Sequence, residues 1–182
     1  MPRLKEWKLL DDSLTLKTPV FDVINRHCLS PKDGLEKNFV CLSAPEWVNI
    51  FAITPSGQVL LVNQFRHGSR EFSLELPGGV VEPGQSLIET AQRELMEETG
   101  YSAEKFELLC SLRPNPALFG NFIHTFLAVN AAPTGHTDFD ENEELTLTLA
   151  TTDELLAMIL DGRIDHAMMV AAIGFYFAKK SA

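Results

Sequence analysis

The chain has 182 residues, 45% of them hydrophobic, and carries 25 Asp and Glu against 15 Lys and Arg, for a formal net charge of −10. This length and composition suit one compact domain with a small appendage and allow a sizeable hydrophobic core. So acidic a chain is a poor electrostatic partner for nucleic acid or an anionic membrane, although it could bind an anionic small molecule if metal ions supply the positive charge.

Residues 1–43 alternate short apolar strings with polar turns, and they contain no apolar run followed by a small-residue cleavage site. FDVIN (21–25) and KNFVCLS (37–43) predict two strands, joined by the Pro/Asp/Gly turn SPKDG (30–34). We therefore expect a small antiparallel sheet, which is marginal alone and must pack on something else.

Two apolar runs, residues 47–54 and 58–65, flank the turn PSG (55–57) and predict a buried hairpin. EFSLELP (71–77) alternates apolar and polar residues, as a half-buried strand does. The glycine- and proline-rich stretch GGVVEPG (78–84) then predicts a loop.

The first clear helix is predicted over SLIETAQRELMEET (86–99). Ser86 and Glu89 have the spacing of a capping box, and Gly100 supplies the C-terminal stop. One face of this helix is expected to pack on the core, because apolar residues recur every four positions at Leu87, Ala91 and Leu95.

Further strands are predicted at residues 106–112, 122–129 and 145–150, and two helices follow at about 151–160 and 164–179. Strands interrupted by one helix, with two more helices at the end, predict a mixed α/β layer fold.

The cysteines Cys28, Cys41 and Cys110 are odd in number, widely spaced and without a Cys-x-x-Cys pair. They predict neither a disulfide framework nor a zinc site, and free thiols fit a reducing compartment. No window reaches the roughly 18 apolar residues that span a bilayer. We expect a soluble, cytoplasmic protein.

Glu94, Glu97 and Glu98 crowd the end of the predicted helix, where like charges repel and the helix dipole favours cations. Their spacing places the carboxylates on one side of the helix, away from the apolar stripe. Mg²⁺ or Mn²⁺ binds such oxygen ligands and turns the repulsion into attraction. The alternative is a solvated acidic helix end, in which Arg93 and Glu97 form an ordinary i,i+4 pair.

The stretch GGVVEPGQSLIETAQRELMEETGY (78–101) resembles the Nudix box, G-x5-E-x7-R-E-U-x-E-E-x-G-U, in which U is bulky and aliphatic. Tyr101 puts an aromatic residue in the last slot, and Gln85 stands where the pattern has glutamate. Glu82 is a candidate to compensate for that lost charge. The other defining positions match at the required spacing: Gly79, Arg93, Glu94, Leu95, Glu97, Glu98 and Gly100.

The resemblance implies a metal site for Mg²⁺ or Mn²⁺, formed by Glu94, Glu97, Glu98 and the backbone carbonyl of Gly78. Metals that bridge phosphate oxygens neutralise their charge and polarise phosphorus. A carboxylate such as Glu97 can activate the attacking water. Arg93 is expected to fix the loop on the helix by pairing with a carboxylate.

Residues 60–79 are similar to the branch that hydrolyses ADP-ribose and nucleoside diphosphate sugars. Arg66 is a candidate clamp for the diphosphate, and Glu75 is also assigned to substrate binding. The alternative is a structural pair between the two. The similarity rests on a Gln-aromatic-Arg unit and a Glu-Leu-Pro unit: Gln64, Phe65, Arg66, Glu75, Leu76 and Pro77.

Two later loops also resemble this branch. Pro114 and Pro116 fall where it has a proline that borders the substrate, and we assign Pro116 to substrate binding; turn formation alone is the alternative. DENEELTLTL (140–149) resembles its mobile acidic loop, which implies that Glu141 is the catalytic base and Glu143 a metal ligand. The alternative is a solvated acidic loop.

The extra N-terminal sheet fits the same branch, where it is exchanged across a homodimer and nearby aromatic residues stack on the nucleobase. Trp47 and Phe21 are the candidates, with ordinary core packing as the alternative. Some nucleotide-sugar hydrolases of this branch carry Asp-x-Lys on the last helix. Here the stretch from Asp165 to Met168 has no lysine, which favours ADP-ribose.

The expected fold class is α/β: a Nudix fold over residues 44–182, built as an α/β/α sandwich with a mixed sheet, preceded by a small antiparallel dimerisation sheet over residues 1–43. The expected reaction is metal-dependent hydrolysis of the pyrophosphate bond of ADP-ribose and related nucleoside diphosphate sugars, giving a nucleoside monophosphate and a sugar phosphate. Alternative substrates are GDP-mannose, FAD and dinucleoside polyphosphates. A non-catalytic Nudix domain that senses a nucleotide metabolite is the remote alternative.

Overall fold

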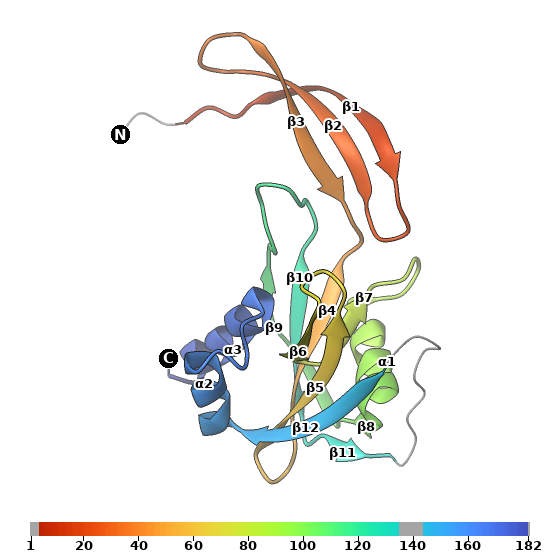
Figure 1. Cartoon of the computed structure of the whole chain (residues 1–182), viewed down its shortest axis with the longest axis vertical. Coiled ribbons are helices and arrows are strands. Elements are labelled where there is room, and N and C mark those ends of the chain that lie inside the picture. The colour runs from red at the N-terminus through yellow and green to blue at the C-terminus, as the bar shows by residue number, and fades with distance from the viewer. Residues whose placement is uncertain (1–3, 135–143, 182) are drawn as a thin grey trace. The chain divides into compact units, whose positions relative to one another are not determined.

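The computed structural model describes residues 4–134 and 144–181, and the chain is traced in Figure 1. It forms two compact units. The first comprises Met1–Pro45 and Arg113–Phe122, and the second comprises Glu46–Leu112 and Ile123–Ala182.

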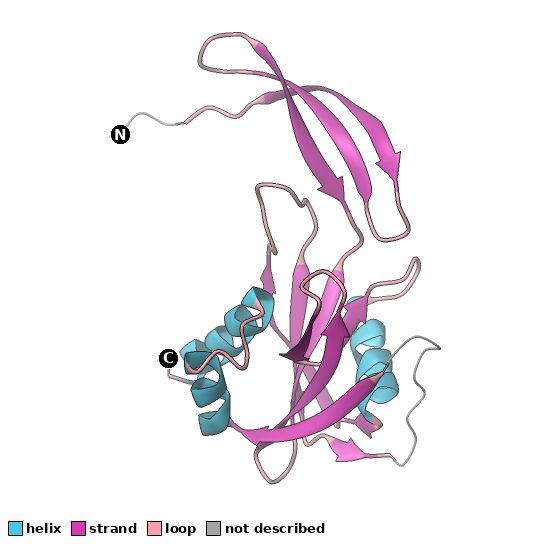
Figure 2. Cartoon of the chain, in the orientation of Figure 1, coloured by secondary structure: helices cyan, strands magenta, loops and turns pink. Residues whose placement is uncertain are grey.

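The first unit contains a three-stranded antiparallel sheet in the order β1 (Lys8–Lys17), β2 (Asp22–Leu29) and β3 (Glu36–Ser43) (Figure 2). In the turn between β2 and β3, Gly34 has φ +70°, a left-handed conformation that glycine adopts without strain. The small antiparallel sheet expected from the sequence is therefore confirmed. It gains a third strand, β1, that the apolar pattern did not single out.

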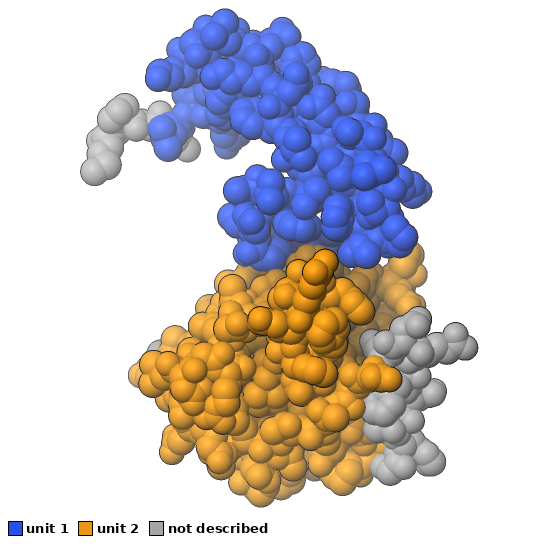
Figure 3. Space-filling view, in the orientation of Figure 1, with its two compact units in different colours: residues 1–45, 113–122 blue, residues 46–112, 123–182 orange. Residues whose placement is uncertain are grey.

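Residues 113–122 belong to this first unit, as Figure 3 shows, although the sequence pattern placed them in the second domain. The backbone N–H of Leu42 donates to the carbonyl of Leu118 at 2.8 Å, and Leu42 forms a parallel bridge with Phe119. The Phe119 ring meets the Phe21 ring edge to face, with 6.4 Å between centroids. These contacts fasten the loop to β3 and to the residues before β2.

Within the described residues, the second unit contains a seven-stranded mixed sheet in the order β12-β5-β4-β10-β9, with β6 paired to β5 and β7 to β4. β4 and β10 are parallel, and the other pairs are antiparallel. β8 and β11 form a separate two-stranded sheet. The strands are β4 (Trp47–Ile53), β5 (Gln58–Arg66), β6 (Glu71–Glu75), β7 (Gly78–Val80), β8 (Tyr101–Ser102), β9 (Lys105–Leu112), β10 (Ile123–Val129), β11 (Ala132–Pro133) and β12 (Leu145–Thr151).

Helix α1 (Leu87–Thr99) covers one face of this sheet, and α2 (Thr152–Leu160) and α3 (Ala167–Lys180) cover the other (Figure 1). Two buried clusters fill the two interfaces, one around α1 and one around α2 and α3. This arrangement is an α/β/α sandwich with a mixed sheet, so the predicted fold class is confirmed.

The central strand β4 is buried on both faces, which explains its nearly continuous apolar sequence. Val48 and Ile50 belong to the cluster around α1. Phe51 points to the other side and stacks on Tyr176 of α3, with 4.2 Å between ring centroids. The loop and helix of residues 78–99 therefore rest against a buried strand.

Both ends of α1 follow the local signals in the sequence. The Ser86 side chain accepts from the backbone of Glu89, and the Glu89 carboxylate accepts from the Ser86 backbone N–H at 2.9 Å, so the predicted capping box is confirmed. Gly100 caps the other end with φ 69°, and its N–H donates to the carbonyl of Met96 at 2.8 Å. These caps fix where the helix begins and ends, and hence the side on which its glutamates lie.

Cys28, Cys41 and Cys110 are free thiols, as expected. Burial raises the pKa of the Cys110 thiol, which keeps it protonated. Within residues 4–134 and 144–181, no helix is both long enough and apolar enough to cross a membrane.

Candidate functional site

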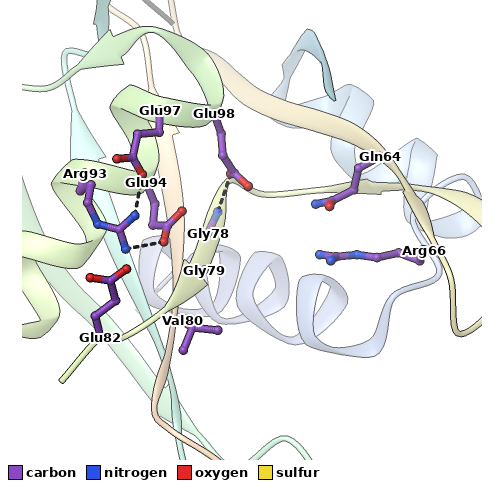
Figure 4. A pocket seen from close by; sticks show the side chains of 10 residues that line it. All are labelled: Gln64, Arg66, Gly78, Gly79, Val80, Glu82, Arg93, Glu94, Glu97 and Glu98. Carbon is purple, nitrogen blue, oxygen red and sulfur yellow. Dashed lines mark hydrogen bonds and ion pairs between the residues drawn. The ribbon is translucent and has the colours of Figure 1, made fainter. Parts of the chain in front are cut away.

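A cavity of about 300 Å³ opens where the end of β5, strand β7 and helix α1 come together (Figure 4). Every residue that lines it belongs to the second unit. Four glutamates and two arginines dominate its surface, so the lining carries a net negative charge. The lining residues are Gln64, Arg66, Gly78, Gly79, Val80, Glu82, Arg93, Glu94, Glu97 and Glu98.

Two glycines let the backbone of β7 approach its neighbours closely. A Cβ atom on Gly79 would lie 2.7 Å from Glu94 Oε2 and closer still to Oε1. A Cβ atom on Gly78 would lie 3.0 Å from the Cα of Asn49 and closer still to a backbone carbonyl oxygen of β4. At Gly78 a side chain would collide with the backbone of the neighbouring strand, whereas at Gly79 it would displace the Glu94 carboxylate from the position that it occupies.

Glu98 joins the end of α1 to β7. Its side chain is buried, with 4% of the residue exposed, and its Oε2 accepts a hydrogen bond from the Gly78 N–H at 2.8 Å. A buried carboxylate is stable only when its charge is compensated, and a backbone donor supplies part of that compensation. The structure thus places the Gly78 backbone directly against a predicted metal ligand.

Arg93 lies between the other two glutamates of the box. Its Nη1 donates to Glu97 Oε2 at 2.5 Å, and its Nη2 donates to Glu94 Oε1 at 2.8 Å. Partial burial lowers the pKa of Arg93, but the neighbouring Glu94 and Glu97 carboxylates outweigh it and raise the pKa above its usual value. The guanidinium therefore stays charged and offsets the repulsion between two carboxylates on adjacent turns.

Arg66 and Glu75 form a bidentate pair on neighbouring strands. Arg66 Nε donates to Glu75 Oε1 and Nη2 donates to Oε2, both at 2.7 Å. Only 2% of Glu75 is exposed. Burial raises the pKa of this carboxyl, but the hydrogen bonds and charge of Arg66 prevail, and the net pKa is below its usual value. The structural pair is therefore present, and Arg66 also lines the cavity.

The donor set suits a hard divalent cation, although within the described ranges no three His, Cys, Asp or Glu side chains form a ready-made metal site. Glu94 and Glu97 are turned toward the guanidinium, and Glu98 toward the Gly78 N–H (Figure 4). Carboxylate and carbonyl oxygens are the ligands that Mg²⁺ and Mn²⁺ prefer. The residues therefore fit such an ion, which would share the carboxylates with Arg93.

The remaining predicted site residues lie elsewhere. Trp47 begins β4, is half-buried and is paired in register with Val80 of the cavity wall. Phe21 and Pro116 belong to the first unit, where Phe21 contacts Phe119. The predicted base Glu141 and the predicted ligand Glu143 fall outside the described residues.

Gln64 lines the cavity but was not assigned to the site from the sequence. The signal was present in the strand period, because Gln64 and Arg66 are two residues apart on β5 and point to the same face. In Figure 4 the two side chains extend side by side toward the glutamates of α1. Val80 also lines the cavity, because it follows Gly79 in β7. No pattern of side chains in the sequence indicated this position.

Comparison with known proteins extends this local pattern to most of the second unit. The NUDIX domain family model matches residues 45–173. A "methanol dehydrogenase activator" of Bacillus methanolicus is 33% identical over 132 residues, which cover 72% of this chain and 71% of that protein. An "ADP-ribose pyrophosphatase" of Bacillus subtilis (strain 168) is 29% identical over 138 residues, or 75% of either chain.

The fold has a close counterpart among solved structures. A protein described as an "ADP compounds hydrolase" matches with a TM-score of 0.85, over 98% of this chain and 96% of its own, at 22% identity. At that identity the likeness speaks for the fold. The family assignment rests on the family match, which spans most of the chain and includes every residue of the cavity. The chain belongs to the NUDIX domain family.

Proposed function

We propose that this protein hydrolyses the pyrophosphate bond of ADP-ribose and related nucleoside diphosphate sugars, giving a nucleoside monophosphate and a sugar phosphate. The observation that carries the proposal is the cavity itself. It brings the α1 carboxylates, the glycine backbone of β7 and the Arg66 guanidinium to one place. A relative that covers most of the chain is named an ADP-ribose pyrophosphatase, which supports this choice of substrate.

Nudix hydrolases generally need divalent metal ions, and we assign Mg²⁺ or Mn²⁺ to this cavity. Glu94, Glu97, Glu98 and the Gly78 carbonyl would hold the ion, with Glu143 as a further proposed ligand. When bound, such an ion neutralises the diphosphate charge and polarises phosphorus toward attack. The net negative lining of the cavity requires this positive charge before a diphosphate can enter.

Arg93 acts in the proposal by holding Glu94 and Glu97 at their present spacing through its two hydrogen bonds. The carboxylate of Glu97, whose side chain is 34% exposed, can take a proton from an attacking water. Glu141, assigned to a loop by resemblance, is the second candidate base. The water oxygen then bonds to phosphorus as the bridging P–O bond breaks, and the released phosphate carries the electron pair.

Arg66 is proposed to bind the diphosphate, because it reaches the cavity while Glu75 fixes its guanidinium plane. Glu75 then serves as a positioning residue, since both of its oxygens accept from Arg66. Trp47, Phe21 and Pro116 are retained as proposed contacts for the nucleobase and sugar. Aromatic rings can stack on a base whatever its hydrogen-bonding pattern.

We also propose that the protein is a cytoplasmic homodimer with exchanged N-terminal sheets. Every residue of β1 is exposed, and a small sheet needs a packed hydrophobic face to be stable. Several large apolar side chains of the sheet are open to solvent in the single chain. A second copy would cover these side chains, which are Leu9, Leu14, Leu16, Phe39 and Val40.

The test of the reaction compares ADP-ribose, ADP-glucose, GDP-mannose and FAD as substrates with Mg²⁺, with and without EDTA. Product release is followed through a phosphatase-coupled phosphate assay, and AMP and ribose 5-phosphate are identified by ion-exchange chromatography. We expect ADP-ribose to be cleaved fastest, and EDTA to abolish cleavage. Tight binding of ADP-ribose without any cleavage would instead establish the non-catalytic sensor.

A further inference from the structure

The turn that leads into α1 brings Glu82 and Gln85 together. The Gln85 N–H donates to the Glu82 carbonyl at 3.1 Å, and Gly84 has φ +89°. With Pro83 before this glycine, the geometry is that of a type II turn. A Cβ atom on Gly84 would meet nothing within 4 Å, so this glycine is required by its backbone conformation and not by space. The first and fourth side chains of the turn become neighbours.

The Gln85 side chain makes two hydrogen bonds of opposite kind. Its Nε2 donates to Glu82 Oε2 at 3.0 Å, and its Oε1 accepts from the Thr90 hydroxyl at 3.1 Å. A carboxylate can only accept, so the amide must turn its NH₂ group toward Glu82. Thr90 is fully buried in α1, and its hydroxyl also reaches the Ser86 carbonyl at 3.1 Å. The amide thus connects the exposed loop to the interior face of the helix.

We propose that Gln85 is a positioning residue. Its neutral amide holds the turn of residues 82–85 on α1 and directs the Glu82 carboxylate into the cavity. This positioning needs no bound cation. Glu82 lines the cavity, and Figure 4 shows its carboxylate turned toward the Arg93 side. A glutamate at position 85 would lose the donor and place a second negative charge beside Glu82. Restoring the glutamate of the family pattern would therefore loosen this loop.

The test is a set of variants studied by thermal unfolding in EDTA and then with added Mn²⁺. In EDTA, Gln85→Glu should melt about 2–4 °C below the wild type, the shift expected for one lost hydrogen bond in a domain of this size. Glu82→Gln should melt like the wild type, because two amides still form a hydrogen bond. The exchange variant Glu82→Gln/Gln85→Glu should regain the wild-type melting temperature, since it restores one donor, one acceptor and one charge.

Mn²⁺ supplies a second measurement that does not depend on catalysis. Free Mn²⁺ is followed by electron paramagnetic resonance during titration of each variant. Saturating Mn²⁺ should raise the melting temperature of Gln85→Glu more than that of the wild type, because a cation can join two adjacent carboxylates. The matched control is Gln92→Glu, which adds the same charge at an exposed position of α1 outside the cavity. It should behave like the wild type in both measurements.

The inference concerns the cavity of the proposed function, but the two can fail separately. Wild-type melting of Gln85→Glu in EDTA, or no recovery in the exchange variant, would overturn the role of Gln85. Absence of hydrolysis with the melting pattern intact would overturn the proposed function alone. If both hold, kcat/KM with Mg²⁺ should fall in Gln85→Glu and return toward the wild-type value in the exchange variant.

Discussion

The Gly78 backbone N–H donates to the Glu98 carboxylate at 2.8 Å, which ties strand β7 to the buried end of α1. The carbonyl of the same residue is a proposed metal ligand, so in the proposal one peptide segment would contact both the helix and the ion. This contact and its burial hold the Glu98 carboxylate against the Gly78 backbone.

Replacement of Glu98 by glutamine should therefore remove the negative charge while keeping the folded structure. The amide oxygen can still accept from Gly78, so the variant should fold and elute like the wild type in size-exclusion chromatography. Loss of the ligand charge should reduce kcat by on the order of 100-fold or more with Mg²⁺. Near-normal turnover would contradict the assignment of Glu98 as a metal ligand.

Alanine at the two glycines of β7 should have different consequences. At Gly78 the new methyl group meets backbone atoms of β4, which cannot move aside. We expect about 1–3 kcal/mol of destabilisation, measured by urea unfolding. At Gly79 the methyl group meets only the Glu94 carboxylate, at the end of a flexible side chain. That variant should stay close to wild-type stability and lose turnover. Equal stability losses in the two variants would count against this distinction.

Glu75→Gln should impair substrate binding through Arg66. The amide cannot accept at both positions, so the guanidinium loses its fixed orientation. A fall of roughly ten- to hundredfold in kcat/KM is expected, mainly through KM. Glu71→Gln is the matched control, because Glu71 is an exposed residue of β6, the strand that also carries Glu75, and lies opposite Arg66 of β5. An unchanged KM for Glu75→Gln would argue that Arg66 has no part in binding.

The same pair predicts how stability depends on pH. The folded pKa of Glu75 lies below its usual value of 4.5, so the unfolded chain binds this proton more readily. The pair therefore stabilises the fold fully above about pH 4.5 and loses this contribution as the pH falls through the folded pKa. Urea midpoints at pH 7, 5 and 3.5 should show a steeper acid loss for the wild type than for Glu75→Gln. Parallel profiles would contradict the assignment of this pKa shift to the pair.

The exposed apolar side chains of the N-terminal sheet predict dimerisation. Leu14→Glu or Phe39→Glu should convert a dimer into a species with the 20.3 kDa mass of one chain, as measured by light scattering. Thr15→Glu, an exposed polar position on the same strand, serves as the control. A wild-type protein that is already monomeric would remove the exchanged sheet from the proposal.

The features that the sequence determined by itself are local. The capping box of Ser86 and Glu89 and the stop at Gly100 depend on residues a few positions apart, and they define α1 without help from the rest of the chain. The spacing of Glu94, Glu97 and Glu98 follows from the helix period once those ends are set. The carboxylates could therefore be placed on one side of the helix before any tertiary contact was known, and the resemblance to the family pattern located the Nudix box.

Only the tertiary structure decided the contacts between segments distant in the chain. The grouping of residues 113–122 with the N-terminal sheet depends on Leu42 meeting Leu118 and Phe119, which no local period encodes. Gln64 lines the cavity because folding brings the end of β5 to the same place as residues of β7 and α1. Strand pairing and side-chain hydrogen bonds depend on which surfaces come into contact after folding. Short-range sequence patterns specify the helices and strands but not the contacts between them.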